Sequence, residues 1–570
     1  MITERVDDIP LLVAKLEESN LSQHLNRYFP DHGNWTGLDG GKLAVVFLTY
    51  VLSLGDHRLN HVESWAGERL FTLRHSLNAA NLTQKDFTDD RLGSLMERFS
   101  DESKWDKFEA DHNKEMLDIY DLRPSKEVVR LDALIVQSFR DQGEHFKRGY
   151  SKQHRADLPQ LKVMVATVDP LSMPLSSVIV SGNKADDNLY QDVVKKLEKS
   201  MPKKQQLFVG DAKLSSTGNR AYLQNKEQFY LTPLSETQCS KEQLSAYLGN
   251  KPDKLTAVFG EAKTNDKKAP LKAHAFEQQE DIYCEDLDIT WTERRIIVYS
   301  PSYSNQLNKK LDERKEVVEQ KLKTLLEPKQ GKKKWKNKAE LEVSVTQLLK
   351  KYKLQKFIDV EVKENLSLRP VQKYRDRPAR VKEELSFSLE VQVNEEALAA
   401  HRLKLGWRVY ATNAPVTYLS TKEAVICYRQ EYRIEHKFNE LLNKITSLMP
   451  VYLKKDHRIK ALIRLLLLAL KFVSVIEYQV RQELENTEQK IKGLYVGNPG
   501  RATAKPTSKM ILEAFKNITL VIMPIQNQIF IKISELKPIQ QQLLKFLKIS
   551  PSAYLGLEQV SFSDSHLGET

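Results

Sequence analysis

Apolar and polar residues recur with a different period in each part of the chain. Over the first 125 residues, apolar side chains lie three and four positions apart, as at Leu43, Val46, Phe47 and Tyr50. This spacing gathers apolar side chains on one side of an α-helix. The pattern therefore predicts a helical N-terminal unit over residues 1–125.

Short runs rich in β-branched residues replace this period from about residue 128. Such runs, bounded by glycine, proline or asparagine, are typical of buried strands. We predict three strands, a helix and two further strands at residues 128–136, 161–168, 177–180, 187–201, 206–210 and 229–234. Strands interrupted by a helix in this way indicate a mixed α/β layer.

The segment over residues 236–405 has a pattern of its own. It contains a strand-like run at 296–299, a charged helical stretch at 305–327 and a strict alternation of apolar and polar residues at 385–393. Alternation with a period of two indicates a half-buried strand. We interpret residues 236–405 as an insertion domain with β-strands and a charged helix.

The α/β pattern resumes after this insertion. A strand-like run at 407–413 is followed by a mainly helical stretch from 421 to about 494. The α/β domain is thus predicted in two parts, followed by a small C-terminal region, with bounds 126–235, 406–495 and 496–570.

The chain carries an excess of positive charge. Its 88 lysine and arginine residues outnumber its 76 acidic residues, which gives a formal net charge of +12. Cationic side chains that neutralise phosphates release condensed counterions, so this excess favours a polyanionic partner such as nucleic acid. A basic protein without such a partner has the same composition, and charge alone does not separate the two.

Other features of the composition indicate a cytoplasmic protein. The three cysteines are widely separated, so the sequence predicts neither a CxxC zinc site nor a disulfide framework. The N-terminus lacks the basic start and apolar run of a signal peptide. The longest apolar run, 461–480, contains charged residues that are costly in lipid, so we expect a buried helix and no membrane span.

Three acidic residues stand out as candidates for chemistry. Asp132 interrupts an apolar strand-like run, where a carboxylate is costly unless it is paired or binds a metal. Asp211 ends another such run, and acids at the carboxyl ends of strands commonly face a ligand crevice. Glu435 lies beside the apolar helix stripe of Ile434 and Phe438. Each also has an ordinary interpretation: a solvent-facing strand residue, a turn or N-cap aspartate, and a solvated glutamate.

Segments around these acids resemble a known family in the same order along the chain. The sequence is similar to the bacterial insertion-sequence DDE transposases of the IS four superfamily, close to the group numbered sixteen thirty-four. The similar segments are Tyr150–Val163 (YSKQHRADLPQLKV), Phe208–Ser216 (FVGDAKLSS), Trp291–Arg295 (WTERR) and Tyr428–Phe438 (YRQEYRIEHKF).

The resemblance implies a fold, a reaction and its partners. The fold is a ribonuclease-H-like catalytic domain, interrupted by a β-rich insertion domain and preceded by a helical domain that binds DNA ends. Asp132, Asp211 and Glu435 would hold two Mg²⁺ ions, with Mn²⁺ able to substitute. The enzyme would cut double-stranded DNA at the ends of its insertion sequence and join them to target DNA, as a homodimer on DNA. Its location would be the bacterial cytoplasm, with the nucleoid.

Several cationic residues are candidates for phosphate contacts. The family pattern carries an arginine four residues before the glutamate and a lysine seven after it, and here these positions are Glu431 and Leu442. Nearby candidates for DNA binding are Lys213, Arg433 and Lys437, together with the basic cluster of Lys332, Lys333, Lys334 and Trp335. A solvated loop between two helices explains that cluster equally well.

The departures at Glu431 and Leu442 leave three functions open. An active transposase requires the three acids. A DNA-binding protein derived from a transposase, but impaired in catalysis, accounts for the missing cations. A metal-dependent nuclease on the same fold would cut DNA without joining it.

Overall fold

A computed structural model gives the fold of the chain. It describes residues 1–122, 127–139, 143–149, 155, 157–185, 187–260, 271–327, 335, 337–371, 380–443, 446–525 and 528–559. The predicted mixed α/β class is confirmed, because a large mixed sheet is combined with many helices.

The N-terminal unit is helical, as predicted, but it opens with a strand. Its elements are β1 (Ile2–Arg5), α1 (Ile9–Glu17), α2 (Leu21–Tyr28), α3 (Gly40–Leu54), α4 (Leu59–Gly67), α5 (Leu70–Ser76), a 3-10 turn (Gln84–Phe87), α6 (Asp89–Phe99) and α7 (Glu102–Ile119). The apolar face of α3 is buried along nearly its whole length. The apolar helical period therefore marks a packed core.

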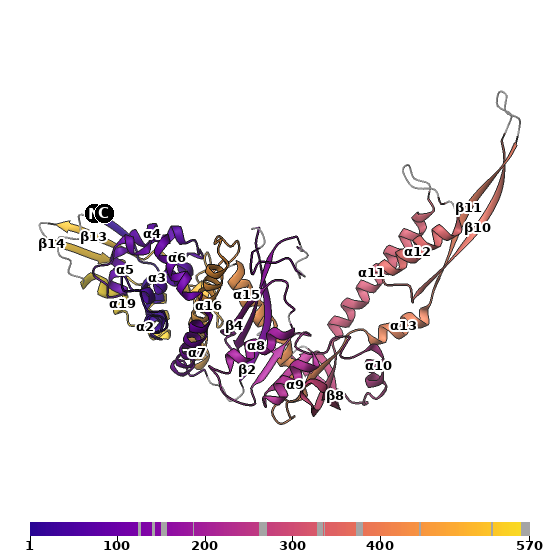
Figure 1. Cartoon of the computed structure of the whole chain (residues 1–570), viewed down its shortest axis with the longest axis horizontal. Helices are drawn as coiled ribbons and strands as arrows, with labels where there is room; N and C mark the ends of the chain where they lie inside the picture. The colour runs from indigo at the N-terminus through magenta and orange to yellow at the C-terminus, as the bar shows by residue number, and fades with distance from the viewer. Residues whose placement is uncertain are drawn as a thin grey trace.

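The C-terminal region folds back onto this N-terminal unit. Its elements are α17 (Ser508–Glu513), β13 (Thr519–Ile525), β14 (Gln528–Ile533), α18 (Pro538–Phe546), α19 (Ser552–Leu555) and a 3-10 turn (Gly556–Gln559). β1 pairs antiparallel with β13, which pairs with β14. The first strand of the chain and its last hairpin thus share one small sheet (Figure 1).

A mixed sheet of nine described strands forms the centre of the protein. The strands are β2 (Val128–Gln137), β3 (Gln160–Val168), β4 (Met173–Ser181), β5 (Leu207–Gly210), β6 (Phe229–Pro233), β7 (Thr256–Phe259), β8 (Leu271–Cys284), β9 (Ile289–Tyr299) and β12 (Trp407–Thr412). Their order is β4-β3-β2-β5-β6-β12-β9-β8-β7. β2, β3 and β4 form an antiparallel meander, whereas β5 is parallel to both β2 and β6. The six predicted elements between 128 and 234 are all present within a few residues of the expected bounds.

Helices cover this sheet and connect it to the N-terminal unit. They are α8 (Asp187–Leu197), α9 (Thr217–Asn225), α14 (Thr421–Arg429), α15 (Tyr432–Asn443) and α16 (Asp456–Asn486). α16 packs against β4 and also against α3 and α6, and its apolar side chains are buried. None of the described helices is long and apolar enough to cross a membrane.

The predicted insertion contributes to the central sheet and also forms an arm. β7, β8 and β9 extend the sheet through β12, with α10 (Lys241–Gly249) beside them. The arm consists of α11 (Pro301–Leu325), α12 (Lys338–Lys351), α13 (Glu395–Lys404), β10 (Ile358–Val371) and β11 (Arg380–Val393). It projects away from the rest of the protein (Figure 1), and among the described strands β10 and β11 pair only with each other. The unit bounds at residues 125, 235, 405 and 495 stay predictions.

Candidate active site

Asp132 and Asp211 lie at the same level on two neighbouring parallel strands. In the register of β2 and β5, Leu131 is the partner of Gly210. Asp132 and Asp211 are the next residues along each chain, so the two acids follow a paired position. Parallel neighbours lie about 4.8 Å apart across a sheet. Residues separated by 79 positions in the sequence are therefore brought together where β5 ends.

Asp132 lies on the face of β2 that α14 and α15 cover. Its neighbour Arg130, two residues earlier, donates a hydrogen bond from Nη2 to the carbonyl oxygen of Cys427 in α14 (3.0 Å). Side chains two residues apart in a strand point to the same face. α15 also packs against β2. Asp132 is only partly buried, and its Oδ1 accepts a hydrogen bond from the backbone amide of Ala133 (2.7 Å).

Asp211 is held by three hydrogen bonds just beyond β5. Its Oδ1 accepts from the hydroxyl of Tyr190 in α8 (2.7 Å) and from the backbone amide of Lys213 (2.8 Å). Its carbonyl oxygen accepts from the hydroxyl of Thr232 in β6 (2.8 Å). Within the described ranges Oδ2 accepts no hydrogen bond, so one carboxylate oxygen is fixed and the other is available to a ligand.

Glu435 lies on the first turns of α15, on a face that is exposed. Ile434 and Phe438 are buried, as the sequence pattern predicts, and they anchor the helix on the core. The mainly helical stretch predicted from residue 421 is interrupted here, because α14 ends at Arg429 and α15 begins at Tyr432. Buried apolar residues hold each of the two helices against the core, and the break lies between the two helices.

Glu431 lies in this break, and the charges of two of the three acids affect its pKa. Burial raises the pKa of the Glu431 carboxyl above its usual range, and a hydrogen bond with Tyr428 opposes this shift. The negative charges of Asp211 and Glu435 raise the pKa of Glu431 further. Because electrostatic effects of this kind fall off with distance, Asp211 and Glu435 both lie near Glu431. The charges of Asp211, just beyond β5, and of Glu435, on α15, thus both act on Glu431.

Arg130 is a structural residue of the site that the sequence pattern did not reveal. It is almost fully buried, and it donates from Nε and Nη2 to the carboxylate of Asp169 at 2.7 to 3.1 Å. Asp169 is also 3.8 Å from Nη1 of Arg433 in α15. Arg130 thus connects β2, the end of β3 and α14, and a charge inside a strand-like run was its one signal in the sequence.

The donor set fits a hard divalent cation in its chemistry. Carboxylate oxygens are the ligands that Mg²⁺ and Mn²⁺ prefer. The acids are not gathered at ligand distances, however: in the described part of the chain, no group of three His, Cys, Asp or Glu side chains is close enough to hold a metal ion. The prediction of two ions stays a prediction.

The predicted cationic residues have different surroundings. Lys213 is exposed beside Asp211, whereas Lys437 is buried and donates from Nζ to Glu440 (2.8 Å). Trp335 packs against the apolar core of the arm, and its Nε1 donates to the carbonyl of Leu325 (3.3 Å). The three lysines Lys332, Lys333 and Lys334 lie outside the described residues, so their contact with DNA stays a prediction.

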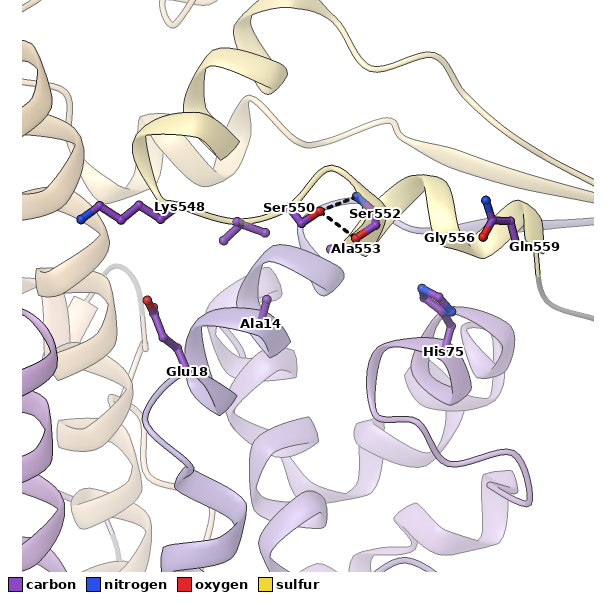
Figure 2. A pocket seen from close by; sticks show the side chains of 10 residues that line it. Ala14, Glu18, His75, Lys548, Ser550, Ser552, Ala553, Gly556 and Gln559 are labelled. Carbon is purple, nitrogen blue, oxygen red and sulfur yellow. Dashed lines mark hydrogen bonds between the residues drawn. The ribbon is translucent and has the colours of Figure 1, made fainter.

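A hollow of about 680 Å³ is lined by residues that are distant in sequence from Asp132, Asp211 and Glu435. Figure 2 shows that α1, α5 and the C-terminal residues line it, with Glu18 and Lys548 toward one end and His75 and Gln559 toward the other. Ser550 and Ser552 bond to each other there (2.8 Å). The hollow belongs to the N- and C-terminal units and contains none of the acids.

Comparison with known proteins identifies the family. No curated protein matches the chain. Among solved structures, it is similar to the piggyBac transposase in a synaptic complex with hairpin DNA, at 10% identity and a TM-score of 0.35, over 96% of this chain and 84% of that one. A likeness this low carries no argument about the site. The family model described as a transposase DDE domain matches residues 123–472, which include Asp132, Asp211 and Glu435. The chain belongs to the DDE-domain transposase family.

Proposed function

We propose that this protein is an active DNA transposase of the cut-and-paste type. It binds the ends of its insertion sequence, cuts the DNA strand there and joins the freed end to target DNA. The proposal includes a homodimer on DNA, a place in the bacterial cytoplasm, and membership of the group numbered sixteen thirty-four. The strand order β4-β3-β2-β5-β6, with β5 parallel to β2, supports a ribonuclease-H-like catalytic domain.

The observation that supports this proposal is that two of the three acids lie at the same level on neighbouring parallel strands. Asp132 and Asp211 follow a paired position of β2 and β5. Glu435 is joined to Asp211 through their common effect on the pKa of Glu431. Two acids at neighbouring strand positions repel, and a structural role alone gives no reason to place them there.

The chain's own residues would prepare these acids for cations. Tyr190 and the amide of Lys213 hold Oδ1 of Asp211, and this leaves Oδ2 without a described hydrogen bond. Arg130 and Asp169 hold β2 against α14, and thereby hold Asp132 near α15.

Asp132, Asp211 and Glu435 would hold two Mg²⁺ ions, which stabilise both the attacking and the leaving oxygen at a phosphodiester. Water adds to phosphorus and the bond to the 3′ oxygen breaks, leaving a 3′-hydroxyl and a 5′-phosphate. That hydroxyl then attacks a phosphodiester of the target, and a target 3′-hydroxyl leaves. No oxidant or cofactor is needed for this exchange of esters.

The test uses DNA that carries the ends of the element, which flank the gene. The protein is incubated with this DNA and a target duplex, with Mg²⁺, with Mn²⁺ or with EDTA, and cut and joined products are resolved on a gel. We expect cutting and joining only with a metal. End binding without cutting under every metal condition would overturn the proposal, and cutting without joining would favour a nuclease.

Single substitutions test the site assignment in the same assay. Asp132→Asn, Asp211→Asn and Glu435→Gln each lower the cutting rate by about a hundredfold or more, because each removes a ligand of a unit that acts together. Asp192→Asn is the matched control, since Asp192 is exposed on α8 and its ion pair with Lys195 is long (4.0 Å). Cutting that survives the first three substitutions would refute the assignment.

A transposase-derived protein impaired in catalysis is the second candidate. Glu431 adds a negative charge beside Asp211 and Glu435, and Leu442 packs against the core instead of offering a cation. The double substitution Glu431→Arg and Leu442→Lys restores the family's cations. A large gain in cutting would support impairment, whereas the active-enzyme proposal predicts that wild type already cuts.

A further inference from the structure

A large groove lies directly beside the helix that carries Glu435. It has a volume of about 930 Å³ and lies between α15, the second half of α16 and the segment that follows α16. Its lining includes Tyr432, Arg433, His436, Arg481, Lys490 and Lys505. Among these residues, only Arg433 is one of the DNA-binding candidates of the sequence.

The geometry of α15 places the groove-lining residues of this helix next to Glu435. Successive residues of an α-helix are rotated by about 100°. Tyr432 therefore follows Glu435 around the helix, His436 follows Tyr432, and Arg433 follows His436. All four side chains are at least partly exposed. A ligand that reaches Glu435 can thus continue across Tyr432 into the groove without crossing the buried face of Ile434 and Phe438.

Cationic groups on two sides of the groove suit a phosphate backbone. Arg433 is 29% exposed on the α15 side, where its one described ion pair is the long contact with Asp169 (3.8 Å). On the other side Lys490 and Lys505 are exposed, and neither makes an ion pair with a described residue. Arg481 is fixed between them by Glu477 (2.8 Å) and the carbonyl of Pro506 (2.9 Å).

An aromatic ring stands at the entrance of the groove. The side chain of Tyr432 is 61% exposed, which is unusual for a tyrosine on a helix that packs against a core. An exposed aromatic ring beside cationic groups is typical of single-strand binding surfaces, since every base can stack on it. Acidic residues also reach the groove, with Glu485 in the last turn of α16 and Glu488 just after it, so the cationic part is the α15 side together with Lys490 and Lys505.

We propose that this groove binds the backbone of the DNA strand that continues from the phosphate at the active site, with Tyr432 stacked on a base near the cut. The inference rests on the proposed function, because it takes the scissile phosphate to lie at the three acids. Arg433, Lys490 and Lys505 contact phosphates, and Arg481 shapes the floor between them.

The test measures binding without cutting. The full chain with Asp132→Asn, in EDTA, is titrated against fluorescein-labelled DNA, and anisotropy is recorded over a range of salt concentrations. Three probes are compared: an element-end duplex, the same duplex with a single-stranded extension beyond the cut, and an unrelated duplex. The probe that depends on the groove identifies which strand it holds.

Charge reversal at the two free lysines gives the critical variant. Lys490→Glu with Lys505→Glu lowers affinity for the extended probe by about tenfold or more, and the salt slope falls by about two, because two phosphate contacts are lost. Tyr432→Ala weakens the extended probe by about fivefold or more and hardly changes the unextended duplex. The control, Lys532→Glu with Lys545→Glu, changes the net charge equally on exposed residues outside the groove.

Equal losses in the groove variant and in the control would overturn the inference, since only overall charge would then matter. Unchanged binding in both would overturn it as well. This test can fail independently of the proposed function. If the groove variant binds DNA as the wild type does, the groove inference is wrong, but the result of the metal-dependent cutting assay still stands. Suppose instead that the protein never cuts DNA, but that charge reversal lowers its affinity for the extended probe. This result would support the groove inference and contradict the proposed enzymatic function.

Discussion

The buried pair of Arg130 and Asp169 gives the sharpest prediction about how the site is held. Arg130→Met removes a side chain that is 1% exposed and leaves the Asp169 carboxylate, 11% exposed, without its main partner. Removing one member of a buried pair costs about 3–5 kcal/mol of folding free energy. Arg433 remains 3.8 Å from Asp169, so we expect a value at the lower end.

The reverse substitution is expected to cost more. In Asp169→Ala, the described hydrogen-bond partners left to Arg130 are the carbonyl oxygen of Cys427 (3.0 Å) and its Sγ (4.0 Å), and the buried charge of Arg130 has no described counter-ion. The double variant removes both charges, so its loss should be smaller than the sum of the single losses by about 2 kcal/mol. Urea unfolding followed by circular dichroism measures all four proteins. Additive losses, or an Arg130→Met protein as stable as wild type, would show that the pair does not hold the sheet to α14.

Three further predictions concern single residues. Glu293 is fully buried and accepts hydrogen bonds from Arg220 and Tyr230; Glu293→Ala should lower the unfolding free energy by about 3–5 kcal/mol, and a loss under about 1 kcal/mol in urea would contradict this. Tyr190→Phe removes the hydroxyl that fixes Asp211; cutting should slow by about twofold to tenfold with stability nearly unchanged, and equal rates would argue against positioning. Burial lowers the pKa of Lys471 from 10.5 to about 8. Between these values the unfolded chain binds more protons, so folding stability should rise with pH from about 8 to 10.5, and Lys471→Met should remove that rise.

The strands of the catalytic unit could be predicted because each is a short apolar run of its own. Residues 128–136 and 161–168 match β2 and β3 closely, since most positions of both strands are buried and apolar. Pairing between distant segments cannot be recognised from such local runs. β1 is four residues long and joins β13 more than 500 residues later, and nothing local in its sequence specifies that partner.

The insertion shows a second limit of the sequence pattern. Its separate composition indicated a separate unit, yet β8 and β9 continue the central sheet next to β12. Hydrogen bonds between strand edges depend on backbone geometry, so a strand can pair with a neighbour from any part of the sequence. The arm from α11 to α13 is the part that projects on its own (Figure 1).

The acids of the candidate site could be named from the sequence, but their support could not. Asp132 and Asp211 stand out because an acid in or after an apolar strand is unusual. Tyr190, Thr232 and Arg130 hold the site through contacts made only in the folded chain. Glu431 could be recognised as unusual against the family pattern, and the structure adds that it lies near Asp211 and Glu435.

The central claim is that Asp132, Asp211 and Glu435 hold one metal centre. Iron-directed cleavage tests it most directly: Fe²⁺ replaces Mg²⁺, ascorbate and peroxide generate radicals at the bound ion, and the cut peptides are mapped by mass spectrometry. We predict backbone cuts next to all three acids, lost together in Asp132→Asn and suppressed by excess Mg²⁺. Cuts near only one acid, or cuts that persist in Asp132→Asn, would contradict a shared centre.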